Sequence, residues 1–216
     1  MDNYLKVLKR VGRVLIAFGL LDIGFMIYCI TRGQSYSSSF NIFAVIAGVF
    51  LFRGHLGAAR VVTSFSAFML TGFVGAVLVL FPFLQPFDLW ITQVRLHPVS
   101  SLLYVGVASG VIALLLWVYT QLRSPAVVQA RTAAGQSASP PKAAFLFGVL
   151  LVLGLSVALH FTLHGEAAAN AMRLAKAKEG SAYKYCVTSM SWAGDHGRAA
   201  VTAYNDRQIK SVDVEW

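Results

Sequence analysis

Apolar residues run along most of this chain in long blocks, without the alternation or the helical spacing that a half-buried element shows. Five blocks are separated by short polar or basic segments, at residues 14–30, 40–52, 61–82, 99–122 and 143–164. A transmembrane helix needs about 20 mostly apolar residues, and four of the blocks approach or exceed that length. The pattern therefore predicts a mostly α-helical fold, a polytopic membrane bundle of five transmembrane helices.

The second block, "FNIFAVIAGVFLF" at 40–52, is the weakest of the five predicted spans. As a helix its 13 residues extend about 20 Å, which is less than the thickness of the hydrocarbon core. It spans if Ser37–Ser39 lies in one interface and Arg53 in the other, with the arginine side chain reaching water. The alternative is a re-entrant segment, which enters and leaves the membrane on the same side.

Two of the segments between blocks have a composition of their own. Residues 83–98 mix Phe, Leu and Trp with two prolines, a composition typical of the membrane interface. Residues 123–142 are rich in Ala, Ser and Pro and poor in large apolar residues. That second composition predicts a flexible linker.

The C-terminal segment, 165–216, has the pattern of a small water-exposed domain. "GEAAANAMRLAKAKEG" predicts a helix that ends at Gly180, and residues 182–191, 198–205 and 209–216 predict three strands. One helix and a three-stranded meander form a thin core. We therefore expect this α+β domain to lean on the membrane bundle or on a partner.

These predictions divide the chain into four parts. They are a four-helix transmembrane bundle (1–122), a cytoplasmic flexible linker (123–142), a fifth transmembrane helix (143–164) and a small extracytoplasmic α+β domain (165–216).

Composition and charge agree with a membrane protein and predict its orientation. The chain is 57% hydrophobic and only 12% charged, with a net charge of +9. With the N-terminus inside, the segments 1–13, 53–60 and 123–142 hold nine Lys and Arg on the inner side, against two in the outer loops. This asymmetry predicts a multi-pass protein of a bacterial-type inner membrane, with a cytoplasmic N-terminus and an extracytoplasmic C-terminal domain. The basic excess is best explained by topology and anionic lipid, and no aromatic-interleaved basic patch favours nucleic acid as a partner.

Asp22 is a carboxylate near the middle of the first block. Such a group costs on the order of 3 kcal/mol on insertion scales unless it is protonated, paired or hydrated. Thr71 and Ser109 lie at a similar depth by residue count, so the three form a candidate intramembrane polar site. We favour a protonated Asp22 that holds helices together by hydrogen bonds. The alternative is a proton or cation relay in a small transporter or channel.

His160 and His164 lie four residues apart, so on a helix both imidazoles share a face and could reach one ion. Ser156 continues that face. Two ligands are too few for a structural zinc site, so we favour a face turned into the bundle and expect no metal and no cofactor. A metal- or haem-linked membrane protein is the second alternative.

Two further residue types bear on packing. Cys29 and Cys186 both fall on the oxidising side of such a membrane, where a disulfide is one alternative and two independent apolar cysteines are the favoured one. The glycines that favour close approach of helices are Gly12, Gly19 and Gly24 in the first block, and Gly72 and Gly75 in the third.

The chain has no P-loop, Rossmann, serine-hydrolase or zinc-protease motif, which lowers the expectation of an enzyme. We therefore predict a non-enzymatic inner-membrane protein of accessory, assembly or immunity type, which anchors a small extracytoplasmic interaction domain. Its expected partners are the lipid bilayer and a membrane or periplasmic protein that adds a strand to the sheet.

Overall fold

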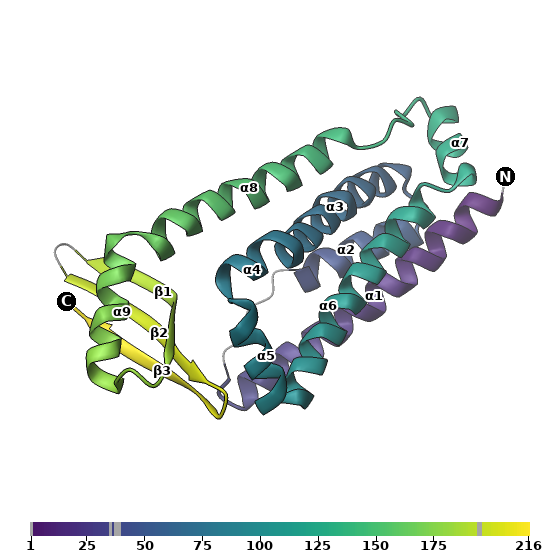
Figure 1. Cartoon of the computed structure of the whole chain (residues 1–216). Helices are drawn as coiled ribbons and strands as arrows, with labels where there is room; N and C mark the ends of the chain where they lie inside the picture. The colour runs from purple at the N-terminus through teal and green to yellow at the C-terminus, as the bar shows by residue number, and fades with distance from the viewer. Residues whose placement is uncertain (1, 35, 37–39, 194–195) are drawn as a thin grey trace. The chain divides into compact units, whose positions relative to one another are not determined.

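The structure, a computed structural model, describes residues 2–34, 36, 40–193 and 196–216, and leaves out the side chains of residues 2, 40, 41, 83, 164, 192 and 193. The fold is mostly helical and ends in an antiparallel sheet (Figure 1). The helices are α1 (Asp2–Thr31), α2 (Phe40–Phe52), α3 (Leu56–Gly75), the π-helical turn η1 (Ala76–Leu80), α4 (Phe81–Leu84), α5 (Phe87–Leu96), α6 (Pro98–Leu122), α7 (Pro125–Ala133), α8 (Lys142–His164) and α9 (Glu166–Glu179). The strands are β1 (Lys184–Ala193), β2 (His196–Asn205) and β3 (Gln208–Glu215).

Within the described residues, four helices are long and apolar enough to cross a membrane. They are Asn3–Thr31, Leu56–Leu80, Pro98–Leu122 and Lys142–Leu163. The expected span at 40–52 is a helix of 13 residues, α2, and falls short of that length. Four of the five expected spans are therefore helices of sufficient length and hydrophobicity, and the fifth stays a prediction.

Contacts divide the chain into two units that do not follow the expected domain boundaries. Unit 1 is Met1–Leu70 with Ala113–Leu146, and unit 2 is Thr71–Ile112 with Phe147–Trp216. The division passes through α3, α6 and α8, because each of these long helices packs with different neighbours along its length. Each unit is described by itself below.

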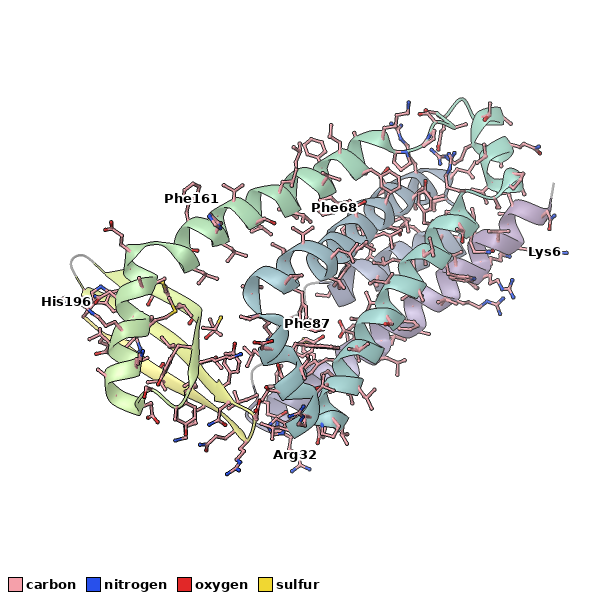
Figure 2. The ribbon with its side chains drawn as sticks, in the orientation of Figure 1. Lys6, Arg32, Phe68, Phe87, Phe161 and His196 are labelled. Atoms are coloured by element: carbon pink, nitrogen blue, oxygen red, sulfur yellow. The ribbon has the colours of Figure 1, made fainter. Side chains whose placement is uncertain are left out.

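The core of unit 1 is built on the N-terminal half of α1. Leu8, Val11 and Leu15 are buried there, and they pack with apolar side chains of α2, α3, α6 and α7. The basic residues of the same half, Lys6, Lys9, Arg10 and Arg13, are exposed at the spacing of a single helix face. Figure 2 shows Lys6 extending away from α1. The start of α1 is therefore amphipathic, with one face in the core and one basic face.

The segment predicted as a flexible linker, 123–142, contains a short helix. It contains α7, which begins at Pro125 after Ser124 and buries Val127 in the core of unit 1. Proline is favoured in the first turn of a helix because its missing N–H costs nothing there. Two arginines fix the turn after α7: Arg123 and Arg131 donate hydrogen bonds of 2.6 Å to backbone carbonyls of the 137–138 turn. The composition of the segment did not predict these hydrogen bonds.

Helices α1 and α2 approach so closely that their backbones touch. A Cβ atom added to Gly12 would lie 2.6 Å from the carbonyl oxygen of Gly48, and one added to Gly48 would lie 2.8 Å from the carbonyl oxygen of Gly12. Further along, Gly54 lies against the Leu5 side chain, so α2 runs antiparallel to α1. The expected role of Gly12 in close packing is confirmed, whereas a Cβ on Gly24 would meet nothing within 4 Å.

In unit 2 the long helix α3 ends in the π-helical turn η1, just before a proline. Pro82 has no N–H, and its ring clashes with the carbonyl four residues before it, that of Leu78. A widened turn relieves that clash. One turn earlier, α3 meets α8: a Cβ on Gly75 would lie 2.7 Å from Cγ2 of Val152, which confirms the packing role expected for Gly75.

The C-terminal meander forms as expected, with strand order β1-β2-β3 and antiparallel pairing throughout. Helix α9 lies across one face of the sheet (Figure 1). It presents a stripe of fully buried alanines, Ala168, Ala171 and Ala175, to buried valines of the strands. Small side chains let the helix approach the sheet closely. The helix ends as predicted at Gly180, whose φ of 88° suits glycine.

Candidate functional site

The outer edge of β3 is the first candidate site. Gly197 and Trp216 exchange backbone hydrogen bonds of 2.8 and 2.9 Å, so they are a hydrogen-bonded pair at the end of the β2–β3 ladder. In an antiparallel ladder such pairs alternate with non-bonded pairs, and the β2–β3 register is unbroken. The even-numbered residues of β3 therefore bond to β2. The residues that turn their backbone N–H and C=O outward are Ile209, Ser211, Asp213 and Glu215.

This β3 edge is partly occupied from within the chain. The Lys178 ammonium of α9 donates a 3.3 Å hydrogen bond to the carbonyl oxygen of Asp213. No residue in the described part of the chain accepts a hydrogen bond from the outward amide of Ser211. The edge therefore keeps backbone donors that a further strand could use.

The opposite edge, on β1, is less regular. The β1–β2 register shifts between Val187 and Ser189, which marks a β-bulge. The hydroxyl of Thr188, the residue within the bulge, donates to the carbonyl of Ala200 at 3.0 Å. A bulge bends and twists an edge strand and makes it a poorer template for pairing. Of the two edges, β3 is thus the better suited to strand addition.

The sheet face opposite α9 is covered by α5 near the β2–β3 turn. Lys184 of β1 forms a 2.5 Å ion pair with Asp88 of α5, and Tyr204 of β2 is only 5% exposed. The hydrogen bond with Asp88, and then its negative charge, raise the pKa of the exposed Lys184. Burial raises the pKa of the Tyr204 hydroxyl and of the Cys186 thiol, which lies 3.9 Å from the carbonyl oxygen of Leu84. The small domain therefore leans on the segment 83–98, one of the supports expected for it.

A cleft of about 400 Å³ opens beside this contact. Its charged lining residues are Asp88 and Arg95 of α5, Lys184 of β1 and Asp206 of the turn after β2. Two acids and two bases leave no net charge to select an ion of one sign. The cleft offers a partner polar contacts next to the sheet, which favour specificity more than affinity.

Beyond α5 the same face is polar and open. Arg198 of β2 lies 4.0 Å from Asp213 and 3.6 Å from Glu215, and all three side chains are well exposed. Ion pairs of this kind add little to stability, about 0–1 kcal/mol each. They mark a solvated face that carries acidic side chains directly beside the open β3 edge.

Asp22 has a partner that sequence analysis did not anticipate. Tyr36, in the non-helical segment between α1 and α2, donates its hydroxyl hydrogen bond to the Asp22 carboxylate. Both side chains are half-buried and belong to unit 1. Thr71, which is half-buried, and Ser109, which is exposed, belong to unit 2. The expected gathering of Asp22, Thr71 and Ser109 stays a prediction.

Of the two histidines of α8, His160 has a described side chain. His160 is exposed beside the Phe161 ring, which projects outward from α8 (Figure 2). The side chain of His164 lies outside the described residues. Ser156 is buried and donates to the carbonyl of Val152 at 2.7 Å. The face expected to turn Ser156, His160 and His164 into the bundle is thus buried at Ser156 and exposed at His160, and it stays a prediction.

Metal-ligating side chains and cysteines do not define a further candidate site among the described residues. In the described part of the chain, no group of three or more His, Cys, Asp or Glu side chains lies close enough to hold a metal ion. Cys29 and Cys186 are both free thiols there.

Two partners of these sites went unpredicted, and their sequence signals are weak. Tyr36 is a single aromatic residue in "SYSSS", a stretch that is otherwise typical of a loop. The Lys184–Asp88 pair joins residues 96 positions apart, and no local spacing indicates such a contact.

Comparison of the chain with models of protein families, with curated proteins and with solved structures finds no match. Fold and site therefore define a class: a mostly helical chain with four apolar helices long enough to cross a membrane, followed by a small helix-on-sheet segment.

Proposed function

We propose that this protein is an inner-membrane protein of accessory, assembly or immunity type, which holds the domain 165–216 outside the cytoplasm. There the β3 edge adds a strand from a protein partner, and no reaction is catalysed. The observation that carries the proposal is the regular β3 edge, with the outward amide of Ser211 free to bond. Strand addition uses such an edge: main-chain hydrogen bonds supply affinity, and side chains set specificity.

The surroundings of the edge favour one kind of incoming strand. Asp213 and Glu215 place carboxylates on the open sheet face beside the edge. Cross-strand pairs of opposite charge stabilise a sheet by roughly 0.2–1 kcal/mol each. A strand with Lys or Arg at alternate positions would therefore be preferred.

The proposed orientation of the protein in the membrane rests on two points: nine basic residues on the inner side against two on the outer side, and an odd number of membrane crossings. The contact of α2 with α1 supports the fifth crossing. Gly48 is level with Gly12, so Phe40, eight residues earlier, is level with about Leu20 of α1, some 12 Å further along. Helix α2 thus returns the chain over part of the length of α1.

Tyr36, a described residue between α1 and α2, indicates where the chain lies before α2. Tyr36 reaches Asp22, which lies about one turn or less from the level of Phe40, so Tyr36 lies alongside α1 rather than beyond its end. Non-helical backbone at membrane depth is tolerated where protein or water surrounds it. The contact of α2 with α1 and the position of Tyr36 beside Asp22 together support a fifth crossing, for which α2 alone is short.

A photo-crosslinking experiment in cells tests the strand-addition proposal. A photoreactive amino acid at Lys210 of the full chain should give one discrete adduct. The adduct should disappear in Ser211→Pro, which removes only an outward amide, and persist in Ser211→Ala, which keeps it. Unchanged thermal unfolding of both variants is the control. An adduct equally strong in Ser211→Pro, or no adduct at all, would overturn the proposal.

The Asp22–Tyr36 pair supports a second candidate, a small transporter or channel. A carboxylate that meets a tyrosine hydroxyl on a non-helical segment resembles the broken elements that line polar pathways. In that case Asp22→Asn should abolish proton-coupled or cation flux in proteoliposomes while leaving the melting temperature unchanged.

A further inference from the structure

Arg131 of α7 is a charged residue in the interior of unit 1. Its side chain is only 3% exposed. One terminal nitrogen, Nη2, donates a 2.6 Å hydrogen bond to the carbonyl oxygen of Ser137. Its Nε is buried and has no partner in the described part of the chain. A carbonyl satisfies a hydrogen bond but does not neutralise a charge, and burying an unneutralised charge is costly.

The neighbours of Arg131 make that cost larger. Burial first, and then the positive charges of Arg123 and Arg60, lower the pKa of Arg131. No ion pair in the described part of the chain joins any of these three arginines to a carboxylate. Unit 1 holds ten Lys and Arg against two acids, and one of the two, Asp22, accepts a hydrogen bond from Tyr36.

A cleft of about 260 Å³ adjoins this cluster. Its polar lining residues are Arg60, Thr63, Ser64, Arg131, Ser137 and Ser139. The lining also includes Pro141 and Ala143, at the start of α8, while Arg60 and Thr63 come from the first two turns of α3. Helix α8 begins here without an acidic residue in its first turn. The positive end of the α8 dipole therefore adds to the charge of the arginines.

We propose that the cleft formed by Arg60, Arg131, Ser137 and Ser139 binds a phosphate group. The planar guanidinium offers paired N–H donors at the spacing of phosphate oxygens, and serine hydroxyls complete such sites. The bound anion supplies the negative charge that the chain itself does not provide around Arg131. The site is separate from the β3 edge, and neither proposal depends on the other.

The phosphate group has two sources, an anionic phospholipid headgroup and free phosphate. Arg60 lies near the start of α3, Arg123 directly follows α6, and Lys142 begins α8. Ends of apolar helices lie at headgroup level in a membrane protein, so both sources reach the cleft. An experiment on the purified full chain separates them.

The experiment measures thermal unfolding in a neutral detergent at constant ionic strength, set with sodium chloride. The probes are short-chain phosphatidylglycerol, sodium phosphate and short-chain phosphatidylcholine. Phosphatidylglycerol should raise the melting temperature of the native chain by about 3 °C or more, and phosphatidylcholine should not. An equal rise with sodium phosphate identifies the phosphate group alone as sufficient, and a rise with phosphatidylglycerol only identifies the lipid headgroup.

Three variants make the test specific to the cleft. Arg60→Gln, at an exposed position of the lining, should remove the shift without unfolding the protein. Arg53→Gln is the matched control: an exposed arginine in the same short segment that does not line the cleft. Arg131→Gln removes the buried charge and should also remove the shift; if it does not fold, Arg60→Gln decides alone. No shift with either anionic probe, an equal shift with phosphatidylcholine, or equal shifts in Arg60→Gln and Arg53→Gln would overturn the proposal.

Discussion

At the scale of single residues, the polar groups of this chain are held by partners far away in sequence. Asp22 accepts a hydrogen bond from Tyr36, and Lys184 forms an ion pair with Asp88. No sequence pattern connects the members of either pair. A carboxylate in an apolar helix is costly by itself, so its partner decides whether the helix tolerates it. Substitutions of the partner therefore test each contact directly.

Tyr36→Phe should lower the melting temperature in detergent, because it removes the hydrogen bond to Asp22. A hydrogen bond to a charged or buried group contributes about 1–3 kcal/mol. Asp22→Asn should be tolerated, because the amide oxygen still accepts the bond, whereas Asp22→Leu should destabilise. Tyr28→Phe, an exposed tyrosine of α1, is the control. Equal melting temperatures for Tyr36→Phe and Tyr28→Phe would contradict the contact.

Alkaline pH should weaken the sheet and its contact with α5. The folded protein raises the pKa of Cys186, Tyr204 and Lys184 above their ordinary values of 9.0, 10.0 and 10.5. A raised pKa stabilises the fold fully below the ordinary value, and this contribution is lost as the pH rises through the folded pKa. Circular dichroism should thus show a constant melting temperature from about pH 7 to 8.5 and a fall above about pH 9. Stability that increases above pH 10 would contradict this account.

At the scale of helices and strands, close approach depends on a few glycines. Gly12 and Gly48 bring two backbones together, and Gly75 accommodates Val152. Gly24, Gly72 and Gly106 lie on helices in the same chain, yet a Cβ at each would meet nothing within 4 Å. The number of helical glycines therefore overstates the number of close helix–helix contacts.

Gly12→Ala should destabilise the α1–α2 pair by about 1–3 kcal/mol, because its Cβ would overlap backbone atoms that cannot move aside. Gly24→Ala is the matched control on the same helix, and it should be neutral or stabilise by up to about 1 kcal/mol through helix propensity. Unfolding in mixed detergents measures both. If Gly12→Ala is as stable as Gly24→Ala, the backbone contact does not exist.

Sequence patterns predicted the elements far better than their contacts. The four long apolar helices, the helix that ends at Gly180 and the three-stranded meander all follow from local periodicity and turn residues. The contacts after α7 did not, because Arg123 and Arg131 make them to backbone carbonyls, and composition does not predict such hydrogen bonds.

At the scale of the whole molecule, the number of membrane crossings decides the side on which each connecting segment lies. Single-cysteine variants report that side through labelling with a membrane-impermeant maleimide. Gln34→Cys and Asp206→Cys should be labelled from outside intact spheroplasts. Thr132→Cys, on the exposed side of α7, should be labelled only after permeabilisation.

Each result assigns the topology. Four crossings would reverse the pattern for two positions, so that Thr132→Cys is labelled from outside and Asp206→Cys is protected. That outcome would contradict the five-crossing arrangement and would place the β3 edge in the cytoplasm.

The backbone contact between Gly12 and Gly48 also concerns how the chain is made. During synthesis Gly12 leaves the ribosome about 36 residues before Gly48, which at 5–20 residues per second is an interval of about 2–7 s. Throughout that interval the surface of α1 around Gly12 has no α2 helix packed against it. Helix α2 is too short to insert securely by itself. Helices α1 and α2 should therefore enter the bilayer together, as one helical hairpin. A nascent chain stalled within this interval should therefore expose the α1 surface around Gly12 that α2 later covers.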